Sequence, residues 1–373
     1  MNKILYIFTS GRIEKLHNKD YSKEFYYGYQ YLKENNLDAK ILEFNKINFF
    51  FEKLEYLLSK YLSLPLYLFS LLNKQNFQMM RNSKNIVMVS ESCGFAALPL
   101  LILFKKKYKI KTHLFVMGLF SKKINYPLFE SFHKKIINLL IKYIDNMYIL
   151  GSEEYNIAMN RKVKSKNIYF SPFYVDNNFW KYDNLNIVKN DSILFVGNDS
   201  NRDFELLVKI TKAMSQHNFI FITSNSYIKN IEKDLNNVQV VHGNWSSSSI
   251  TDRQILNYYK NSRIVILPLK NSTQPSGQSV TMQAMSVGIP VMISKTDGFW
   301  DDENFINNEN ILLINSNKVD VWVNKLNEVY SNFDLLRKIS KNSIDTINIK
   351  FDFSAFESFI LGNVRRNTND EAI

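Results

Sequence analysis

The sequence predicts an α/β protein made of two doubly wound, Rossmann-like domains that face each other across a cleft. Short apolar runs alternate with helix-forming stretches along almost the whole chain, which is the pattern of parallel sheets covered by helices. A length of 373 residues fits two domains of ordinary size. We expect an N-terminal domain at residues 1–176, a polar linker at 177–191, a second domain at 192–347, and a C-terminal helix and tail at 348–373 that can cross back to the first domain.

The composition bounds the partners and the compartment. Lys and Arg number 47 against 35 Asp and Glu, so the chain carries +12 and favours phosphates, nucleic acid or an anionic membrane surface. No RNA- or DNA-binding motif appears, so nucleic acid is not expected. Cys93 is the only cysteine, which fits a reducing cytoplasm.

No apolar run reaches the roughly 20 residues of a membrane-spanning helix. The N-terminal run MNKILYIFTSG indicates a strand rather than a signal peptide. We therefore expect a cytoplasmic protein that can lie peripherally on the inner face of the membrane.

The first half of the chain alternates strands and helices. Strands are expected at residues 3–9, 39–44, 85–90, 112–117, 147–150 and 167–170, and helices at 22–33, 96–107, 129–143 and 153–161. The loops after the first, third and fourth strands (11–12, 91–94 and 118–123) should lie at the carboxyl edge of one sheet.

Residues 44–80 carry a broad apolar stripe, rich in phenylalanine, among several lysines. One interpretation is a helix that packs on the sheet. The other is an amphipathic surface that lies on a membrane, and the positive charge of the chain favours it without deciding between the two.

The second half repeats the alternation. Strands are expected at 192–197, 219–223, 238–241, 264–267 and 310–314, and helices at 203–215, 253–261, 319–330, 334–347 and 354–361, followed by a frayed tail at 363–373. Between these elements, residues 267–296 read as strand, polar loop, short helix, tight turn and strand.

The helix within 267–296 starts near Gly277 and ends at Gly288, before Pro290. A helix N-terminus at the carboxyl end of a strand is suited to an anion. The stretch is therefore either a cradle for a phosphate-bearing ligand or an ordinary strand–helix–strand unit. Lys270 in its loop adds a positive charge.

A companion loop follows the strand at 192–197. Gly197 permits close approach of a ligand, Asn198 follows it, and Arg202 offers a bidentate fork for phosphate oxygens. The alternative is a surface arginine beside Asp199 and Asp203. Together with Lys270 and the helix start at Gly277, the two loops form a coherent phosphate site.

A third loop, after the strand at 238–241, contains His242 and Trp245. Trp245 could shelter a nucleobase or could be a half-buried residue at the sheet edge. None of the five histidines stands in a triad spacing, and no Asp-x-Asp pair offers ligands to a metal ion, so no metal is expected.

At this point the second half resembles the nucleotide-sugar-dependent glycosyltransferases of the GT-B fold, especially the retaining family 4. Four blocks carry the resemblance, and the first half resembles the family only in the order of its elements. The blocks are Gly151-Ser152 with Ser171–Asp176 and Phe179-Trp180; Phe195–Gly197 with Arg202-Asp203; Val240–Gly243 with Tyr258-Tyr259 and Ile266–Leu269; and Ser276–Ser279 with Gln283–Met285 and Gly288–Val291.

One departure stands out. The family carries two glutamates eight positions apart in the fourth block, where this chain has Pro275 and Gln283. The resemblance assigns those carboxylates to the donor sugar and ribose. The donor contacts are then left to neutral groups, and we expect weaker or different donor recognition.

The resemblance implies transfer of a sugar from a nucleotide diphosphate donor to a glycan or lipid-linked glycan, with retained configuration, in bacterial surface polysaccharide synthesis. No cofactor is expected besides the nucleotide sugar as co-substrate. The implied catalytic residues are Arg202, Lys270 and Glu91, the last as acid/base. The implied donor-binding residues are Gly197, Asn198, Arg202, His242, Trp245, Ser276, Gly277, Gln278, Ser279 and Gln283; the acceptor would meet Gly11, Arg12 and Gly118.

Two alternatives remain open. A GT-B nucleotide-sugar epimerase binds a similar donor but calls for carboxylates and a histidine in its cleft. A catalytically silent binding protein would explain Pro275 and Gln283.

Overall fold

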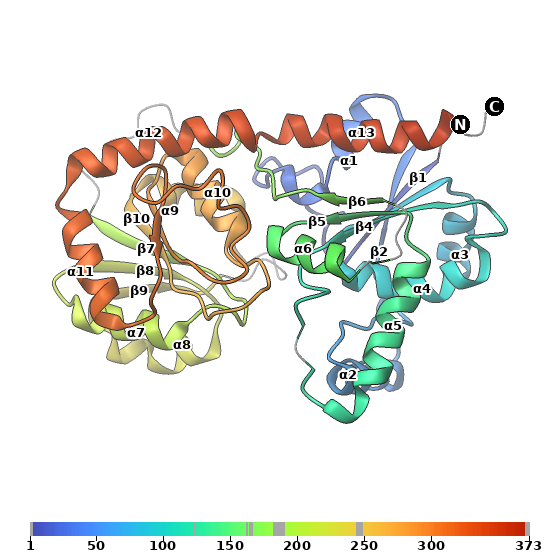
Figure 1. Ribbon diagram of the computed structural model, residues 1–373, viewed down its shortest axis with the longest axis horizontal. Coiled ribbons are helices and arrows are strands. Elements are labelled where there is room, and N and C mark those ends of the chain that lie inside the picture. Colours follow the sequence, from blue (N-terminus) through green and yellow to red (C-terminus); the bar gives the residue numbers. More distant parts are fainter. Residues whose placement is uncertain are drawn as a thin grey trace. The chain divides into compact units, whose positions relative to one another are not determined.

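The computed structural model describes residues 3–122, 124–161, 163, 167–181, 191–243 and 249–369, with side chains up to residue 364. Two compact units divide these residues (Figure 1). Unit 1 is built from residues 3–17, 25–172 and 356–369. Unit 2 is built from residues 18–24 and 173–355.

Unit 1 contains six parallel strands in the order β2-β1-β3-β4-β5-β6. The strands are β1 (Ile4–Phe8), β2 (Ala39–Glu43), β3 (Asn85–Met88), β4 (Lys111–Val116), β5 (Asn146–Ile149) and β6 (Asn167–Phe170). The helices are α1 (Tyr29–Glu34), α2 (Phe49–Leu62), α3 (Lys74–Arg81), α4 (Glu91–Phe104), α5 (Glu130–Lys142), α6 (Ser152–Asn160) and most of α13 (Phe353–Asn369), with short 3-10 turns η1 (Glu24–Tyr26) and η2 (Pro127–Phe129).

Unit 2 contains a second parallel sheet, in the order β12-β11-β10-β7-β8-β9. The strands are β7 (Ser192–Val196), β8 (Asn218–Ile222), β9 (Val238–Val241), β10 (Ser262–Leu267), β11 (Val291–Ser294) and β12 (Leu312–Ile314). The helices are α7 (Phe204–Ala213), α8 (Ser226–Ile231), α9 (Asp252–Lys260), α10 (Gln278–Val287), α11 (Val319–Tyr330) and α12 (Phe333–Lys350), with a 3-10 turn η4 (Glu232–Asp234). The predicted pair of doubly wound, Rossmann-like domains is confirmed.

Each sheet has a point where the strand order reverses. In unit 1 it lies between β1 and β3, and in unit 2 between β7 and β10. Strands β1 and β7 are buried along their whole length, and β10 is buried except at Arg263, as expected for parallel sheets covered by helices on both faces. Loops that leave neighbouring strands in opposite directions open a crevice at such a point, which is where ligands bind in this class of fold.

Three predicted helix boundaries are wrong. The helix expected at 22–33 is broken, because Tyr27 and Gly28 both adopt positive φ and separate η1 from α1. The helix expected to begin at residue 96 begins at Glu91, since the hydroxyl of Ser90 caps it by accepting from the Cys93 amide. The supposed tail after residue 363 continues α13 to Asn369.

Residues 18–24 belong to unit 2 although they precede most of unit 1. The backbone amide and hydroxyl of Ser22 both donate to the buried carboxylate of Asp252, at 3.0 and 2.9 Å. The amide of Arg253 donates to the carbonyl of Asp20 at 3.0 Å. The first turn of α9 therefore holds this N-terminal segment in place.

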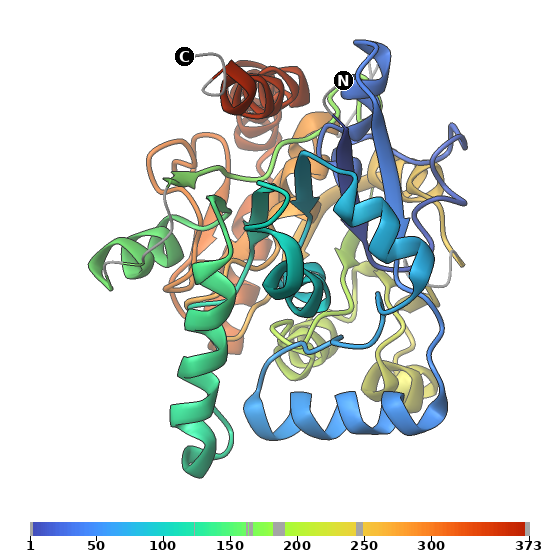
Figure 2. The same ribbon diagram turned by 90° about the vertical axis from the view of Figure 1, so that its right-hand side faces the viewer.

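The side of unit 1 that carries α2 is distinctive. Helix α2 and the N-terminal end of α5 lie side by side at the far end of the unit from α13, in both views (Figures 1 and 2). Among the helices that the structure describes, none is both long and apolar enough to cross a membrane.

Candidate functional site

The loops after β7 and β10 are joined at the reversal point of the unit 2 sheet. The amide of Asp203 donates to the carbonyl of Pro268 at 2.9 Å, and the amide of Lys270 donates to the carbonyl of Asn201 at 2.8 Å. The side-chain amide of Asn201 also donates to the hydroxyl of Ser276 at 2.7 Å. The two sequence-predicted loops therefore form one structure.

The side chain of Arg202 fills the space between these loops. It is only 3% exposed, and its guanidinium lies against two glycines. A Cβ at position 197 would stand 2.2 Å from Nε of Arg202, and a Cβ at position 277 would stand 3.3 Å from its NH1. Glycine at both positions is what admits the buried arginine.

The NH1 group of Arg202 lies at the N-terminus of α10. Gly277 precedes this helix with φ of 83°, and no side chain caps it. The first intrahelical bond runs from the Thr281 amide to the Gly277 carbonyl. Among the residues that the structure describes, no acceptor meets the amides of Ser279 and Val280, as is usual for a first helical turn.

The electrostatics of this point favour an anion. Burial lowers the pKa of Arg202 from its usual value, opposed by the charge of Asp199. The Asp199 carboxylate stands 3.4 Å from Nε and is half exposed. Within the described parts of the chain, NH1 has no hydrogen-bond partner. A buried guanidinium with an unpaired N–H is costly unless an acceptor arrives, and the positive end of α10 adds to that demand.

The other predicted donor residues take different places. Lys270 is exposed, Ser279 is half-buried, and Gln278 is buried in the first turn of α10. The side chain of Asn198 links the loop after β7 to the loops after β8 and β9. Its amide donates to the Gly243 carbonyl at 2.9 Å, and its oxygen accepts from the Thr223 hydroxyl at 2.9 Å.

The predicted base-binding loop is only partly described. His242 is exposed, and its Nε2 lies 2.9 Å from the Glu232 carboxylate. Trp245 lies outside the described residues, so its predicted role stays a prediction.

The side chain of Gln283 meets a carboxylate that no local sequence pattern predicts at this place. Its Nε2 donates to Oε1 of Glu24 at 3.0 Å, and Nε1 of Trp180 donates to the same oxygen at 2.7 Å. Glu24 is buried, and burial with the nearby charge of Asp252 raises its pKa to about 7. The two partners are 259 positions apart, and no local pattern connects them.

The predicted acceptor side contains a pair of buried carboxylates. Glu91 stands in the first turn of α4, not in a loop as expected, because Ser90 caps the helix one residue before it. Its carboxylate accepts from the Met117 amide at 2.6 Å, and Glu154 accepts from the Phe120 amide at 2.8 Å. Both therefore hold the loop after β4, which contains Gly118.

Burial raises the pKa of both carboxyls, to about 8 for Glu154. Lys122 lies close to both charges, and burial lowers its pKa. The sequence analysis did not single out Glu154, because acidic residues are common in the first turn of a helix.

The Gly11–Arg12 loop is anchored to the neighbouring strand. The Glu43 carboxylate of β2 accepts from the amides of Arg12 and Ile13, the latter at 2.6 Å. Gly11 turns with φ of 87°, and the guanidinium of Arg12 lies over the ring of Phe25 at 5.2 Å.

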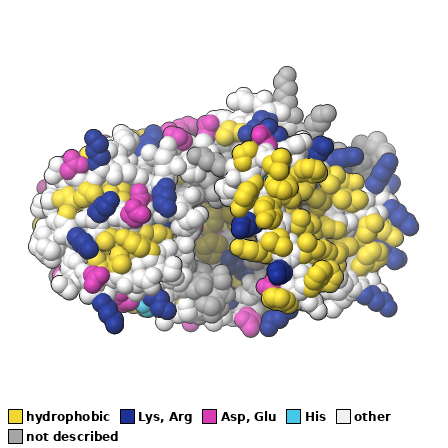
Figure 3. Space-filling model, turned by 90° about the horizontal axis from the view of Figure 1, so that it is seen from below, with side chains coloured by type: hydrophobic (Ala, Val, Ile, Leu, Met, Phe, Trp, Pro, Cys, Tyr) yellow, Lys and Arg dark blue, Asp and Glu magenta, His cyan; other side chains and the backbone are white. Residues whose placement is uncertain are grey.

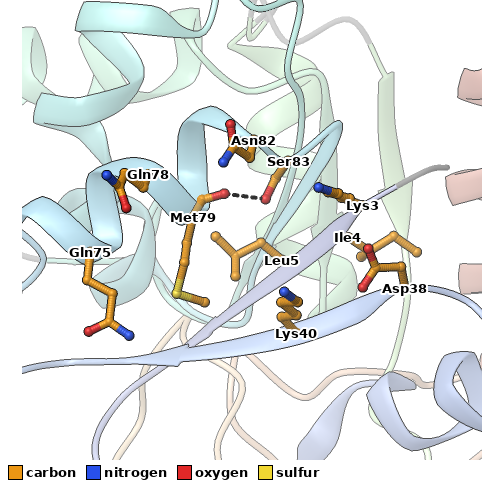
Figure 4. A pocket seen from close by; sticks show the side chains of 10 residues that line it. All are labelled: Lys3, Ile4, Leu5, Asp38, Lys40, Gln75, Gln78, Met79, Asn82 and Ser83. Carbon is orange, nitrogen blue, oxygen red and sulfur yellow. Dashed lines mark hydrogen bonds between the residues drawn. The ribbon is translucent and has the colours of Figure 1, made fainter.

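A separate pocket of about 200 Å³ lies at the opposite edge of the unit 1 sheet, before β1, β2 and β3 (Figure 4). Ligands of doubly wound sheets bind at the carboxyl ends of the strands, whereas this pocket lies at their amino ends. Its polar lining includes Lys3, Asp38, Lys40 and Asn82, and the Ser83 hydroxyl beside it donates to the Met79 carbonyl at 2.7 Å. In the described part of the chain, no group of three His, Cys, Asp or Glu could hold a metal ion; metal independence stays a prediction.

Residues 190–332 match the family model for glycosyl transferases group 1. No curated protein matches the chain. Among solved structures, sucrose-phosphate synthase from Thermosynechococcus elongatus superposes with a TM-score of 0.72 at 14% identity, and each chain is covered completely.

HepE from Anabaena, in complex with UDP-glucose, gives a TM-score of 0.68 at 13% identity and covers 98% of this chain and 100% of its own. A glycosyltransferase from Rickettsia africae gives 0.65 at 13% identity, with 98% of each chain covered. At such identities the likeness shows a shared fold. The chain therefore shares the GT-B fold of these glycosyltransferases, and its residues 190–332 match the group 1 glycosyl transferase family model.

Proposed function

We propose that the protein transfers a sugar, with retained anomeric configuration, from a nucleotide diphosphate donor to a glycan or lipid-linked glycan in bacterial surface polysaccharide synthesis. The observation that supports the donor site is the buried guanidinium of Arg202. Its unpaired NH1 stands at the uncapped N-terminus of α10, at the reversal point of the unit 2 sheet.

In this proposal the donor diphosphate is held at the start of α10. NH1 of Arg202 and the amides of Ser279 and Val280 donate to its oxygens, and Ser276, fixed by Asn201, borders the same turn. The exposed Lys270 supplies a mobile positive charge from the adjoining loop. Gln283 is a positioning residue for α10 in this proposal, because its side-chain amide is bonded to Glu24.

The chemistry follows from the charge that develops. As the bond between the anomeric carbon and the diphosphate oxygen breaks, negative charge grows on the leaving diphosphate. Donors fixed in advance at that point lower the barrier without reorganising. The acceptor hydroxyl bonds to the same face of the sugar and gives its proton to the leaving phosphate oxygen, so no protein nucleophile is required.

Glu91 and Glu154 are positioning residues in this proposal. Their carboxylates hold the backbone of the Gly118 loop, where the acceptor is proposed to bind. The epimerase alternative calls for a histidine and carboxylates at the donor. His242, in the loop after β9, is exposed and paired with Glu232.

The test is donor binding by isothermal titration with UDP and UDP-glucose, the ligands named for HepE. We expect binding by the unaltered protein and a loss of about tenfold to a hundredfold in Arg202→Lys, which keeps the charge but loses the fork. Arg337→Ala, at an exposed arginine on α12, is the matched control and should bind as the unaltered protein does.

Three outcomes separate the possibilities. Equal affinity in Arg202→Lys and Arg337→Ala would reject the phosphate role of Arg202. Donor binding without transfer to any offered acceptor and without donor hydrolysis would indicate a silent binding protein. Release of a product with inverted configuration, read by NMR, would reject retention.

A further inference from the structure

Helix α2 exposes most of its apolar side chains. Only Glu55 and Leu62 are buried among its residues. Phe49 and Phe50 are 77% and 68% exposed, and Tyr56 is 65% exposed. Helices of globular proteins normally gain their stability by burying an apolar face. The side chains of Phe49, Phe50 and Tyr56 therefore add little to the core of unit 1.

The helix is nevertheless held firmly. The Glu55 carboxylate accepts from the Phe69 amide at 2.6 Å, and Nδ1 of His133 on α5 lies 2.6 Å from the Leu62 carbonyl. The ring of Tyr61 lies 5.1 Å from Tyr126 and 5.5 Å from the ring of Phe129. These contacts fix α2 against η2 and the start of α5, so the exposed side chains share one surface.

The same surface continues onto η2 and α5. Leu128 is 86% exposed and Phe132 is 59% exposed. We call this surface the aromatic–lysine face and define its apolar part by six residues: Phe49, Phe50, Tyr56, Leu57, Leu128 and Phe132. Seen from below, a broad hydrophobic area covers this side of unit 1, with Lys and Arg side chains at its margins (Figure 3).

Lysines stand in register with the apolar side chains. On α2, Lys53 and Lys60 are seven residues apart and lie on the helical face that carries the pairs Phe49/Tyr56 and Phe50/Leu57. On α5, Lys135 lies one turn after Phe132 on the same stripe. Ammonium groups on long aliphatic stems beside exposed aromatic rings suit a boundary between apolar and charged layers.

The charge of this surface selects the partner. The exposed lysines of α2 and α5 are Lys53, Lys60, Lys134, Lys135 and Lys142, and Lys46 precedes α2. Their exposed acids are Glu52 and Glu130, and Glu130 is paired with Lys134 at 2.6 Å. A second copy of this chain would bring the same positive face against itself, whereas an anionic lipid surface complements it.

We propose that the aromatic–lysine face docks unit 1 onto an anionic membrane leaflet. The apolar side chains enter the headgroup boundary while Lys53 and Lys60 reach the lipid phosphates. This inference concerns where the enzyme works and does not depend on the donor site.

The test is flotation of the full chain with vesicles of phosphatidylcholine alone and with about a third of phosphatidylglycerol. We expect partition onto the anionic vesicles that falls with added salt, and little onto the neutral ones. Combining Lys53→Gln with Lys60→Gln should lower partition by about 25-fold, at about fivefold per lysine. Combining Phe50→Ser with Leu57→Ser should lower it by about tenfold or more.

Matched controls exist elsewhere in the chain. Leu103→Ser with Ile349→Ser removes two exposed apolar side chains outside the face, and Lys341→Gln removes an exposed lysine of α12. These variants should float as the unaltered protein does. All variants should melt within a few degrees of it, because the changed side chains are exposed.

Several results would overturn the proposal: no flotation of the unaltered protein on anionic vesicles, or equal loss in the control and face variants. A dimer in sedimentation that Phe50→Ser with Leu57→Ser disperses, without vesicle binding, would instead assign the face to a second copy. Donor titration of the face variants keeps this failure distinct from a failure of the donor site.

Discussion

The side-chain amide of Gln283 donates to the carboxylate of Glu24 across 3.0 Å in the interior of unit 2. Gln283 stands where the resembling family has a glutamate, and Glu24 brings a carboxylate to the same place from the N-terminal segment. Two carboxylates this close cannot both ionise without a large cost. The amide at position 283 is therefore the partner that a buried Glu24 requires.

Exchanging the amide of Gln283 and the carboxyl of Glu24 tests this pairing. Gln283→Glu should destabilise the protein by about 1–3 kcal/mol at neutral pH, because it replaces a donor with a second acid. The double variant Glu24→Gln with Gln283→Glu restores one amide and one carboxyl and should recover most of the loss. Chemical denaturation measures both, and a double variant no more stable than Gln283→Glu alone would contradict the pairing.

Glu24 should contribute to the pH dependence of the free energy of unfolding. Burial raises the pKa of Glu24 to about 7 in the folded state. Between the ordinary pKa of a glutamate in the unfolded chain and about pH 7, the folded state therefore binds more protons than the unfolded state. This contribution to stability is complete below about pH 4.5 and is lost as the pH rises through about 7. Glu24→Gln retains the acceptor Oε1 and should flatten this part of the curve. An unchanged slope in that variant would mean that other groups dominate.

Glu154 should act in the same direction at higher pH. Burial and the charge of Glu91 raise its pKa to about 8, so its contribution is lost as the pH rises through about 8. Glu154→Gln should be more stable than the unaltered protein at pH 9 by about 1 kcal/mol or more, since each unit of pKa difference is worth about 1.4 kcal/mol. Thermal melts at acid and alkaline pH make the comparison. Equal melting temperatures at pH 9 would contradict it.

A side chain at position 277 should destabilise the protein and weaken donor binding. The φ of 83° at Gly277 disfavours other residues, and an added Cβ would stand 3.3 Å from NH1 of Arg202. We expect Gly277→Ala to cost about 1 kcal/mol of stability and to weaken UDP binding at least tenfold. Gly362→Ala on α13 is the control, because its Cβ would meet nothing within 4 Å. That variant should be stabilised by about 0.5–1 kcal/mol, as for alanine in a helix interior, with UDP binding unchanged.

The attachment of residues 18–24 to unit 2 should depend on Asp252. Asp252→Ala removes the acceptor for both the amide and the hydroxyl of Ser22. We expect a loss of about 2–3 kcal/mol and faster tryptic cleavage after Lys19 and Lys23. Asp320→Ala, at a residue in the first turn of α11, is a suitable comparison. Similar cleavage rates in the two variants would place the anchor elsewhere.

The sequence by itself determined the α/β class, the two doubly wound sheets and the positions of the loops at which we propose the donor site. Buried parallel strands need long apolar runs, and a helix that starts with Gly277 and stops at Gly288 is visible in the order of residues. The strand-to-helix step at Gly197–Arg202 was equally visible. These features are local, so nearest neighbours in the chain are enough to reveal them.

Only the tertiary structure decided how the distant groups meet. Arg202 could have been a surface residue beside Asp199, and the structure buries it between Gly197 and Gly277. Glu24 and Gln283 are brought together by the docking of residues 18–24 on unit 2. Glu154 on α6 is brought to the amide of Phe120 in the loop after β4. The free-energy cost of burying a charge depends on the groups that surround it in space. Those groups come from distant parts of the chain, so no short stretch of sequence predicts them.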